Sequence, residues 1–252
     1  MTVRVVICDD ALALGRYAAA EVAAALATVL STVGRARLLL STGQSQFETL
    51  ADLVRRPLAW DRIDIFHLDE YAGLPPDHPA SFRRYLKERV ANLVPATMHY
   101  VDPSSPEYMD ALSNLVATSP MDVALVGVGE NGHIAFNDPP ADFDATAPFL
   151  TVHLDDRCRA QQVGEGWFAH VQDVPEQAIT MSVRSIMSSR KIVSAVPHGT
   201  KAHAVAKVVA ATHPRPEVPA TALLTHGDAT LVLDRASSRL LSPVDWSRCV
   251  VL

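Results

Sequence analysis

The sequence predicts an α/β protein with a doubly wound, mostly parallel sheet and helices on both faces, a Rossmann-like three-layer sandwich. Three observations predict this fold. Apolar, β-branched runs alternate along the chain with segments of helical periodicity, which is the pattern of strand–helix–strand units. The 252 residues, 48% apolar and 20% charged, are enough to bury a full core. No internal repeat, low-complexity block or linker divides the chain, so we expect one domain over residues 1–252.

The expected strands are short apolar runs that end in Gly, Ser, Asp or another turn-forming residue. The first run is closed by Asp9 and Asp10, and the second ends in Ser41-Thr42-Gly43. The later runs are similarly rich in Val, Ile and Leu. We therefore expect strands at Val3–Cys8, Arg37–Leu40, Ile63–Leu68, Asp122–Gly127, Leu150–Leu154, Ala178–Val183, Lys191–Val196 and Ala229–Leu233.

The expected helices have apolar residues three or four positions apart and stop at proline or at a polar loop. The helix that begins at Ser45 stops before Pro57. The Ala-rich stretch Ala18–Val33 carries Glu21 and three hydroxyl residues, so we interpret it as a core helix, too short and too polar to span a bilayer. Helices are expected at Ala11–Thr32, Ser45–Arg55, Ser81–Leu93, Pro106–Ala117 and Thr200–Ala211.

One long segment between strands lacks a regular pattern. Asn137–Pro148 is irregular, and Arg157–Asp173 is polar with no clear period. Long irregular segments inside compact domains are often mobile parts of an active site. We therefore expect a lid at about residues 137–173, which low hydrogen-exchange protection would support.

Charge and cysteine content exclude several classes of protein. Lys and Arg number 22 against 28 Asp and Glu, a net charge of −6, so the basic footprint of a nucleic-acid-binding protein is missing. Cys8, Cys158 and Cys249 are odd in number and widely spaced, which argues against a disulfide scaffold or a cysteine zinc site. The first ten residues lack the apolar core of a signal peptide. We expect a cytoplasmic protein with no nucleic-acid or membrane partner.

Ligands of doubly wound folds bind beyond the carboxyl ends of the strands, so the loops that follow strands are the informative ones. The first is Ser41–Ser45, in which Gly43 permits a tight turn and the next helix start offers free N–H groups to a phosphate. Thr42, Gln44 and Ser45 complete this candidate phosphate loop. The alternative is a plain strand-to-helix turn with Ser45 as the N-cap.

The second loop brings Asp69 and Glu70 together at the end of a strand. Adjacent carboxylates repel each other and shift each other's pKa, which suits proton transfer. The alternative is a solvated turn or a helix cap.

The third loop carries Gly127, Gly129 and Gly132 in a G-x-G-x-x-G pattern. A dinucleotide site requires a helix to begin there, and the run ending in Pro139-Pro140 breaks any helix within two turns, so we reject that interpretation. What remains is a glycine-rich loop that presents one histidine.

That histidine is His133, with Asn131 and Asp138 close in sequence. Histidine titrates near neutrality and is the usual proton shuttle, and a neighbouring carboxylate selects its tautomer. A purely structural histidine is the alternative.

The fourth loop is His198–Lys201, where a cation stands at a helix start. The helix dipole disfavours a lysine there unless an anion lies between them; a solvated lysine is the alternative. His198 and His203 are five residues apart, off the spacing of two histidines on one helix face, and no motif supplies three metal ligands. We expect no metal.

Together the four loops resemble the glucosamine-6-phosphate deaminase/isomerase family, relatives of the 6-phosphogluconolactonases. Over about residues 11–236, DEYAGLP from Asp69, with HP and S after it, is similar to the family's DEYxGLPxxHPxS. GVGENGHIAFNDP from Gly127 is similar to GxGxxGHIAFNEP, and Ala178–Met181 and Lys201-Ala202 match its ALT and Lys-Ala positions. Tyr71 and Ile134–Asn137 favour the deaminase branch over the lactonases, which have DER and GHTASLFP.

The resemblance implies an enzyme of amino-sugar metabolism that converts glucosamine 6-phosphate, or a close relative, to a ketose 6-phosphate and ammonia. His133 would open the sugar ring, oriented by Asp138 and Asn131, and Asp69 would move a proton between C2 and C1. No organic cofactor is implied. The remaining candidates bind substrate, and its phosphate in particular: Thr42, Gly43, Gln44, Ser45, Glu70, Gly129 and Lys201.

Four positions depart from the family pattern. Asn131 replaces a frequent Asp, and Asp138 replaces the Glu of FNEP. Gln44 lies where a glycine of the TGGTP loop approaches phosphate, and Gln162 lies where some deaminases have a second phosphate-binding arginine, which Arg157 or Arg159 would have to replace.

These departures keep two alternatives open. One is an isomerase or lactonase-type hydrolase that acts on another sugar phosphate or on an unphosphorylated amino sugar. The other is a sugar-phosphate-binding protein without catalysis. Family members range from monomers to hexamers, and we expect a homo-oligomer.

Overall fold

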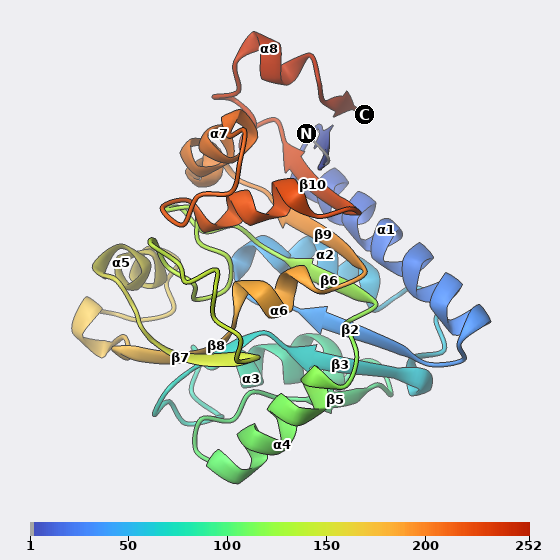
Figure 1. The fold of residues 1–252 in the computed structure, drawn as a ribbon, viewed down its shortest axis with the longest axis vertical. Helices are drawn as coiled ribbons and strands as arrows, with labels where there is room; N and C mark the ends of the chain where they lie inside the picture. The colour runs from blue at the N-terminus through green and yellow to red at the C-terminus, as the bar shows by residue number, and fades with distance from the viewer. Residues whose placement is uncertain (1–2) are drawn as a thin grey trace.

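The computed structural model describes residues 3–252, and its main feature is a sheet of eight strands, each parallel to its neighbours (Figure 1). The strands lie in the order β11-β1-β10-β9-β6-β2-β3-β5. Two parallel strands that follow each other in the chain need a crossover connection, and helices provide most of these connections here. The strands are β1 Arg4–Cys8, β2 Ala36–Leu40, β3 Ile63–His67, β5 Thr97–His99, β6 Val123–Val126, β9 Lys191–Val196, β10 Ala229–Asp234 and β11 Val250–Val251.

The helices differ from the expected ones mainly at their ends. The expected helix Ser45–Arg55 begins as a 3₁₀ turn at Gln44–Gln46, and Ser81–Leu93 ends as a π-helical segment at Lys87–Ala91. The helices are α1 Ala11–Thr32, α2 Phe47–Leu53, α3 Phe82–Leu86, α4 Pro106–Ala117, α5 Asp156–Gly164, α6 Val183–Met187, α7 Ala202–Ala210 and α8 Pro243–Trp246. Further 3₁₀ turns lie at Trp60–Arg62, Val171–Asp173, Gly199–Lys201 and Pro219–Thr225.

The two faces of the sheet pack into two separate hydrophobic cores. In β1, Val6 and Cys8 point into the core under α1, α2 and α3, whereas Val5 and Ile7 point into the core under α4, α6 and α7. This alternation follows from the period of two along a strand. The predicted three-layer α/β sandwich is therefore confirmed.

Helix α1 corrects one detail of the sequence analysis. It has 22 residues and, by length and composition alone, is long and apolar enough to cross a membrane, so the expectation of too short and too polar a stretch is wrong. One stripe of the helix, which includes Leu14, Ala18, Val22 and Leu26, is buried in the core that covers β9 and β10. In this fold α1 is a layer helix of the sandwich.

A second, antiparallel sheet was not expected as a separate unit. It has the order β4-β8-β7, with β4 at Asp69–Tyr71, β8 at Gln177–Met181 and β7 at Phe149–His153. The expected strands Leu150–Leu154 and Ala178–Val183 thus exist with shifted ends, outside the main sheet. The short β4 was expected as a loop because three residues show no period. Its pairing with β8 holds Asp69 opposite Thr180.

Helix α5 lies in the segment that was expected to be irregular. Its buried residues are Cys158 and Gln162, so it has no apolar stripe that periodicity would reveal. Asp155 provides the N-cap, with its carboxylate accepting a hydrogen bond from the Cys158 N–H at 2.6 Å. The segment expected as a lid, residues 137–173, therefore contains the strand β7 and the helix α5.

Candidate active site

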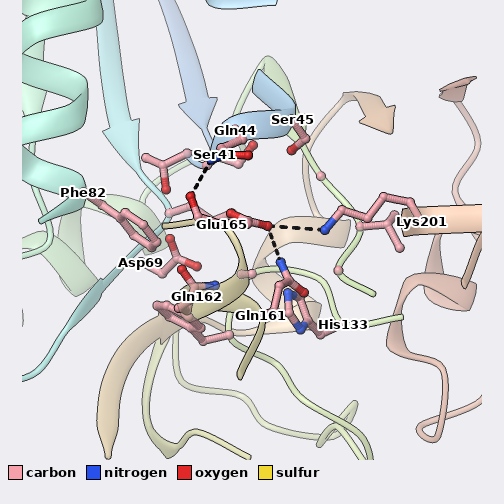
Figure 2. Close-up of a pocket in the computed structure, with 18 residues that line it drawn as sticks. Ser41, Gln44, Ser45, Asp69, Phe82, His133, Gln161, Gln162, Glu165 and Lys201 are labelled. Carbon is pink, nitrogen blue, oxygen red and sulfur yellow. Dashed lines mark hydrogen bonds and ion pairs between the residues drawn. The ribbon is translucent and has the colours of Figure 1, made fainter. Parts of the chain in front are cut away.

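The four loops singled out in the sequence meet around one cavity beyond the carboxyl ends of β2, β3, β6 and β9 (Figure 2). This is where ligands bind in open parallel sheets. The cavity holds about 70 Å³. Its walls are formed by Ser41, Thr42, Gly43, Gln44, Ser45, Leu68, Asp69, Phe82, Gly127, Val128, Gly129, His133, Ala135, Phe136, Gln161, Gln162, Glu165 and Lys201.

Asp69 is the buried acid of this cavity. It begins β4, and only 5% of its surface is exposed. Burial first and the negative charge of Glu70 second raise the pKa of Asp69 to about 8, against an opposing hydrogen bond from a backbone N–H at Phe136. A carboxyl group with a pKa near neutrality can both accept and return a proton.

His133 and Asp138 form a hydrogen-bonded pair beside it. His133 Nδ1 lies 3.0 Å from Asp138 Oδ1. Asn131 supports both partners, since its Nδ2 donates to Asp138 at 3.0 Å and its Oδ1 accepts from the His133 backbone N–H at 3.0 Å. The three residues therefore form one connected network, with His133 at the cavity wall.

The charge state of Asp138 decides which nitrogen of His133 carries the proton. Burial alone would raise the pKa of Asp138, but hydrogen bonds and charge attraction from His133, with hydrogen bonds from Asn131 and the Asp155 N–H, leave it below its ordinary value. An ionised Asp138 can only accept, so Nδ1 of a neutral His133 must donate. The lone pair of Nε2 is then free for chemistry.

Gly129 is a glycine because the His133 ring lies against its Cα. A Cβ added there would lie 2.1 Å from His133 Nε2 and 2.3 Å from Cε1. The expectation that Gly129 contributes to the site thus has a steric explanation.

We expect Gly129→Ala to lower turnover at least about 10-fold, because the ring must swing away from its hydrogen bond to Asp138 and about 1 Å of misplacement can cost 10²-fold. Steady-state kinetics and melting temperature check this. Gly227→Ala is the control, since its added Cβ meets nothing within 4 Å. Unchanged kinetics for Gly129→Ala would contradict the assigned ring position.

The far end of the cavity gathers groups that can bind an anion, and we call it the anion cradle. Gly43, at a φ of 95°, turns the chain where a side chain would be strained, and Tyr85 Oη donates to its carbonyl at 2.9 Å. Ser45 follows in the 3₁₀ turn, and Gln46 Nε2 lies 3.1 Å from the Ser45 hydroxyl. The Lys201 side chain enters from the turn before α7 with only 5% exposed. A buried ammonium group requires an anionic partner.

Glu70 corrects the sequence analysis, because it does not line the cavity. Its fully buried carboxylate accepts hydrogen bonds from the Ser81 hydroxyl at 2.7 Å and from the backbone N–H of Arg83 at 2.8 Å. The Arg83 guanidinium is also 3.4 Å away. These groups belong to the start of α3, so Glu70 anchors that helix to β4 and does not reach the cavity.

Gln162 lines the cavity. Its Oε1 accepts a hydrogen bond from the Tyr71 hydroxyl at 2.7 Å. Arg159 donates to the carbonyls of Val171 and Val174 and does not line the cavity. Arg157 is exposed and lines a second, outer cavity of about 720 Å³, together with Asn131 and His198.

Sequence reasoning missed Glu165 and Gln161, which reach the cavity from the end of α5. The local sequence around Glu165 and Gln161 does not indicate a site, because their role depends on contact with Lys201, which is distant in the chain. Glu165 Oε1 lies 3.5 Å from Lys201 Nζ and 2.8 Å from Gln161 Nε2 (Figure 2).

One group of described residues has the proximity of a metal site. Ligand atoms of His133, Asp138 and Cys158 lie within 4.8 Å of one another, a cluster the sequence spacing did not predict. Burial raises the pKa of the Cys158 thiol strongly, and the carboxylates of Asp138 and Asp155 raise it further. His133 and Asp138 already hydrogen-bond each other, and the Cys158 thiol would have to lose its proton to bind a metal.

The fold and this site define a Rossmann-like α/β protein with an acid–base pair and a lysine-centred anion cradle at the carboxyl edge of its sheet. The chain belongs to the family described as glucosamine-6-phosphate isomerases/6-phosphogluconolactonase, whose model matches residues 9–232. The family resemblance read from the motifs is thus confirmed.

Curated relatives and solved structures agree with this membership. The chain is 31% identical to a glucosamine-6-phosphate deaminase of Streptococcus pneumoniae serotype 4, over 82% of this chain and 89% of the relative. It is 31% identical to one of Bacillus pumilus, over 92% and 97%. A monomeric glucosamine-6-phosphate deaminase of known structure matches with a TM-score of 0.85 and 29% identity, over 94% and 99%. A 6-phosphogluconolactonase of Trypanosoma brucei, 16% identical over 95% and 99% with a TM-score of 0.76, shares the fold.

Proposed function

We propose that this protein is a glucosamine-6-phosphate deaminase, which converts glucosamine 6-phosphate and water to fructose 6-phosphate and ammonia. The observation that carries the proposal is the union of three groups on one cavity: the high-pKa Asp69, the His133–Asp138 pair and the Lys201 cradle. The deaminase relatives, which match over most of their length, support the same reaction.

In the proposed mechanism His133 opens the sugar ring. Nε2 of the neutral ring takes the proton of the O1 hydroxyl and returns it to O5 as the C1–O5 bond breaks. Asp138 stabilises the positive charge that His133 carries between these steps, since their atoms are 3.0 Å apart. Asn131 keeps both side chains in place.

Asp69 then catalyses the isomerisation. Its carboxylate removes the proton from C2 of the open-chain sugar and delivers it to C1. The C1 carbonyl oxygen gains a proton and the C2 amine loses one, so the aldehyde becomes a primary alcohol and the amine becomes an imine. Water adds to the imine carbon, and ammonia leaves. Each proton-transfer step of this kind contributes about 10²–10⁴-fold.

The cradle is proposed to hold the sugar's 6-phosphate. Thr42, Gly43, Gln44 and Ser45 surround one side, and Lys201 provides the positive charge on the other. The start of a helix adds free N–H groups and a favourable dipole. Lysine binds phosphate as a point charge, which tolerates a loose geometry.

Purified protein incubated with glucosamine 6-phosphate tests the proposal. We expect ammonia and fructose 6-phosphate in equal amounts. Folded protein that forms neither product would overturn it. The same assay with 6-phosphogluconolactone addresses the lactonase alternative, and ligand-dependent melting without turnover would instead support a binding protein.

The pKa of Asp69 predicts a pH dependence. A base must be ionised, so kcat/KM is expected to rise with pH and to level off above a pKa of about 8 in the free enzyme. A pH–rate profile between about pH 5 and 9.5 measures this limb. A profile that is already flat above pH 6 would show that the free enzyme does not have this base.

Some expectations from the sequence stay predictions. We propose one domain over residues 1–252, a lid at 137–173, a cytoplasmic location and no nucleic-acid or membrane partner. A homo-oligomer also stays a proposal, and one relative of known structure is described as monomeric. Native mass spectrometry measures the oligomeric state directly.

A further inference from the structure

Glu165 lies inside the anion cradle. Its carboxylate stands 3.5 Å from Lys201 Nζ, and its side chain is 17% exposed. Gln161 Nε2 donates to one carboxylate oxygen at 2.8 Å, and Trp167 Nε1 donates to the other at 3.1 Å. A carboxylate with this many partners is held in one position.

The opposite wall of the cradle holds the same residue through its backbone. Gln44 Nε2 donates to the Glu165 carbonyl oxygen at 2.5 Å. The end of α5 is thus tied to the phosphate loop on one side and to Lys201 on the other, as the dashed lines of Figure 2 show. Gln44 is the residue that departs from the family's phosphate loop, and here it binds the protein's own chain.

The space that remains is too small for a sugar phosphate. The inner cavity holds about 70 Å³, whereas sites for small molecules usually span about 300–1,000 Å³. The outer cavity beside it holds about 720 Å³. Glu165 and Lys201 line both cavities, so their ion pair lies where the two meet. Separating them would join the spaces.

The charges lead to the same conclusion. Glu130 Oε1 is also 3.9 Å from Lys201 Nζ, so two carboxylates already face one ammonium group. A phosphate dianion added beside Glu165 would meet like charge in a partly buried site. Carboxylate and phosphate are both anionic oxygen acceptors, so they compete for Lys201 and repel each other beside it.

We propose that Glu165 is an internal substitute for the substrate's phosphate, which pairs with Lys201 until a phosphate group displaces it. Displacement frees the end of α5, joins the two cavities and admits the sugar to Asp69 and His133. Glu165 then determines specificity, because a ligand without a strongly charged phosphate cannot compete for Lys201. The identity of the sugar rests on the proposed function, whereas the displacement itself does not.

Inorganic phosphate tests the displacement of Glu165 without depending on the identity of the sugar. Its affinity is measured by calorimetry for the wild type, Glu165→Gln and Glu176→Gln. The last is a matched control, since Glu176 is exposed and does not line the cavities. We expect Glu165→Gln to bind phosphate at least about 10-fold more tightly, because the amide keeps the size of the side chain and one acceptor oxygen but loses the competing charge. Glu176→Gln should match the wild type.

A second variant, Trp167→Phe, keeps the test possible if Glu165→Gln does not fold. Trp167→Phe keeps an aromatic ring beside Phe47 and Tyr85 and removes only the Nε1 donor to Glu165. It should tighten phosphate binding by a smaller factor. Equal or weaker phosphate binding by both variants, or no phosphate binding by any of the proteins, would overturn the proposal.

The two proposals fail differently. If Glu165→Gln binds phosphate more tightly but no variant releases ammonia from glucosamine 6-phosphate, the displacement stands and the proposed function fails. If the wild type releases ammonia and Glu165→Gln changes neither phosphate affinity nor KM, the function stands and the displacement fails.

Discussion

Asp69→Asn is expected to lower kcat for ammonia release by about 10²–10⁴-fold or more, with little change in KM. The amide has nearly the same shape as the carboxyl group but cannot take the proton from C2. Asp69 touches the cavity and not the anion cradle, so phosphate binding should persist. Paired measurements of kcat, KM and the affinity for inorganic phosphate check this.

The same substitution is expected to stabilise the fold, and the gain has a defined pH window. The pKa of Asp69 rises from 3.8 to about 8 on folding, so the folded protein keeps a proton that the unfolded chain releases. The wild type therefore loses stability as pH rises from 3.8 toward 8, whereas asparagine does not ionise. The Tm of Asp69→Asn should exceed the wild-type Tm by a margin that grows across this window.

Asp61→Asn is the control, because Asp61 is exposed and lies just before β3, whose other end leads to Asp69. It should change neither turnover nor the pH dependence of the Tm. Near-normal turnover by Asp69→Asn would remove Asp69 from the mechanism. A Tm difference that is constant with pH would contradict the buried, protonated state.

His133→Gln is expected to lower kcat by about 10²–10⁴-fold, because glutamine cannot carry a proton between O1 and O5. The loss should come without unfolding. Asp138 keeps hydrogen bonds from Asn131 at 3.0 Å and from the Asp155 N–H at 3.2 Å, so its buried carboxylate is not left without donors. Kinetics and melting curves measured together distinguish a catalytic role from a structural one.

His213→Gln, in an exposed loop away from the cavity, is the matched control. We expect it to behave as the wild type. If the melting temperature of His133→Gln instead falls sharply together with its turnover, His133 is a structural residue, which was the alternative considered from the sequence.

The fold could be predicted because, in strongly periodic segments, the spacing of the apolar residues shows which face of a helix or strand is buried. The alternation of Val5 and Ile7 with Val6 and Cys8 separates the two cores of the sheet, and α1 shows its buried stripe in the sequence. The short elements β4 and β5 and the helix α5 could not be predicted. Each has too few apolar residues to show a period, and neighbours distant in the chain stabilise it.

The candidate site likewise has residues that the sequence predicted and residues that it did not. Asp69, His133 and Lys201 stand at strand ends within distinctive motifs, and the sheet topology brings them to one cavity. Glu70 stands in the same motif as Asp69, yet it serves the start of α3, since neighbouring residues of a strand face opposite sides. Sequence adjacency did not distinguish the two carboxylates.

The sequence by itself determined the class of fold, the family and the chemistry-bearing loops, because these depend on local patterns of polarity and on short motifs. Only the tertiary structure decided which groups face one another: the His133 ring against Gly129, and Glu165 against Lys201. Glu165 and Lys201 are far apart in the chain and lie at the end of α5 and just before α7. Their ion pair depends on distance and burial, which packing creates and no local pattern records.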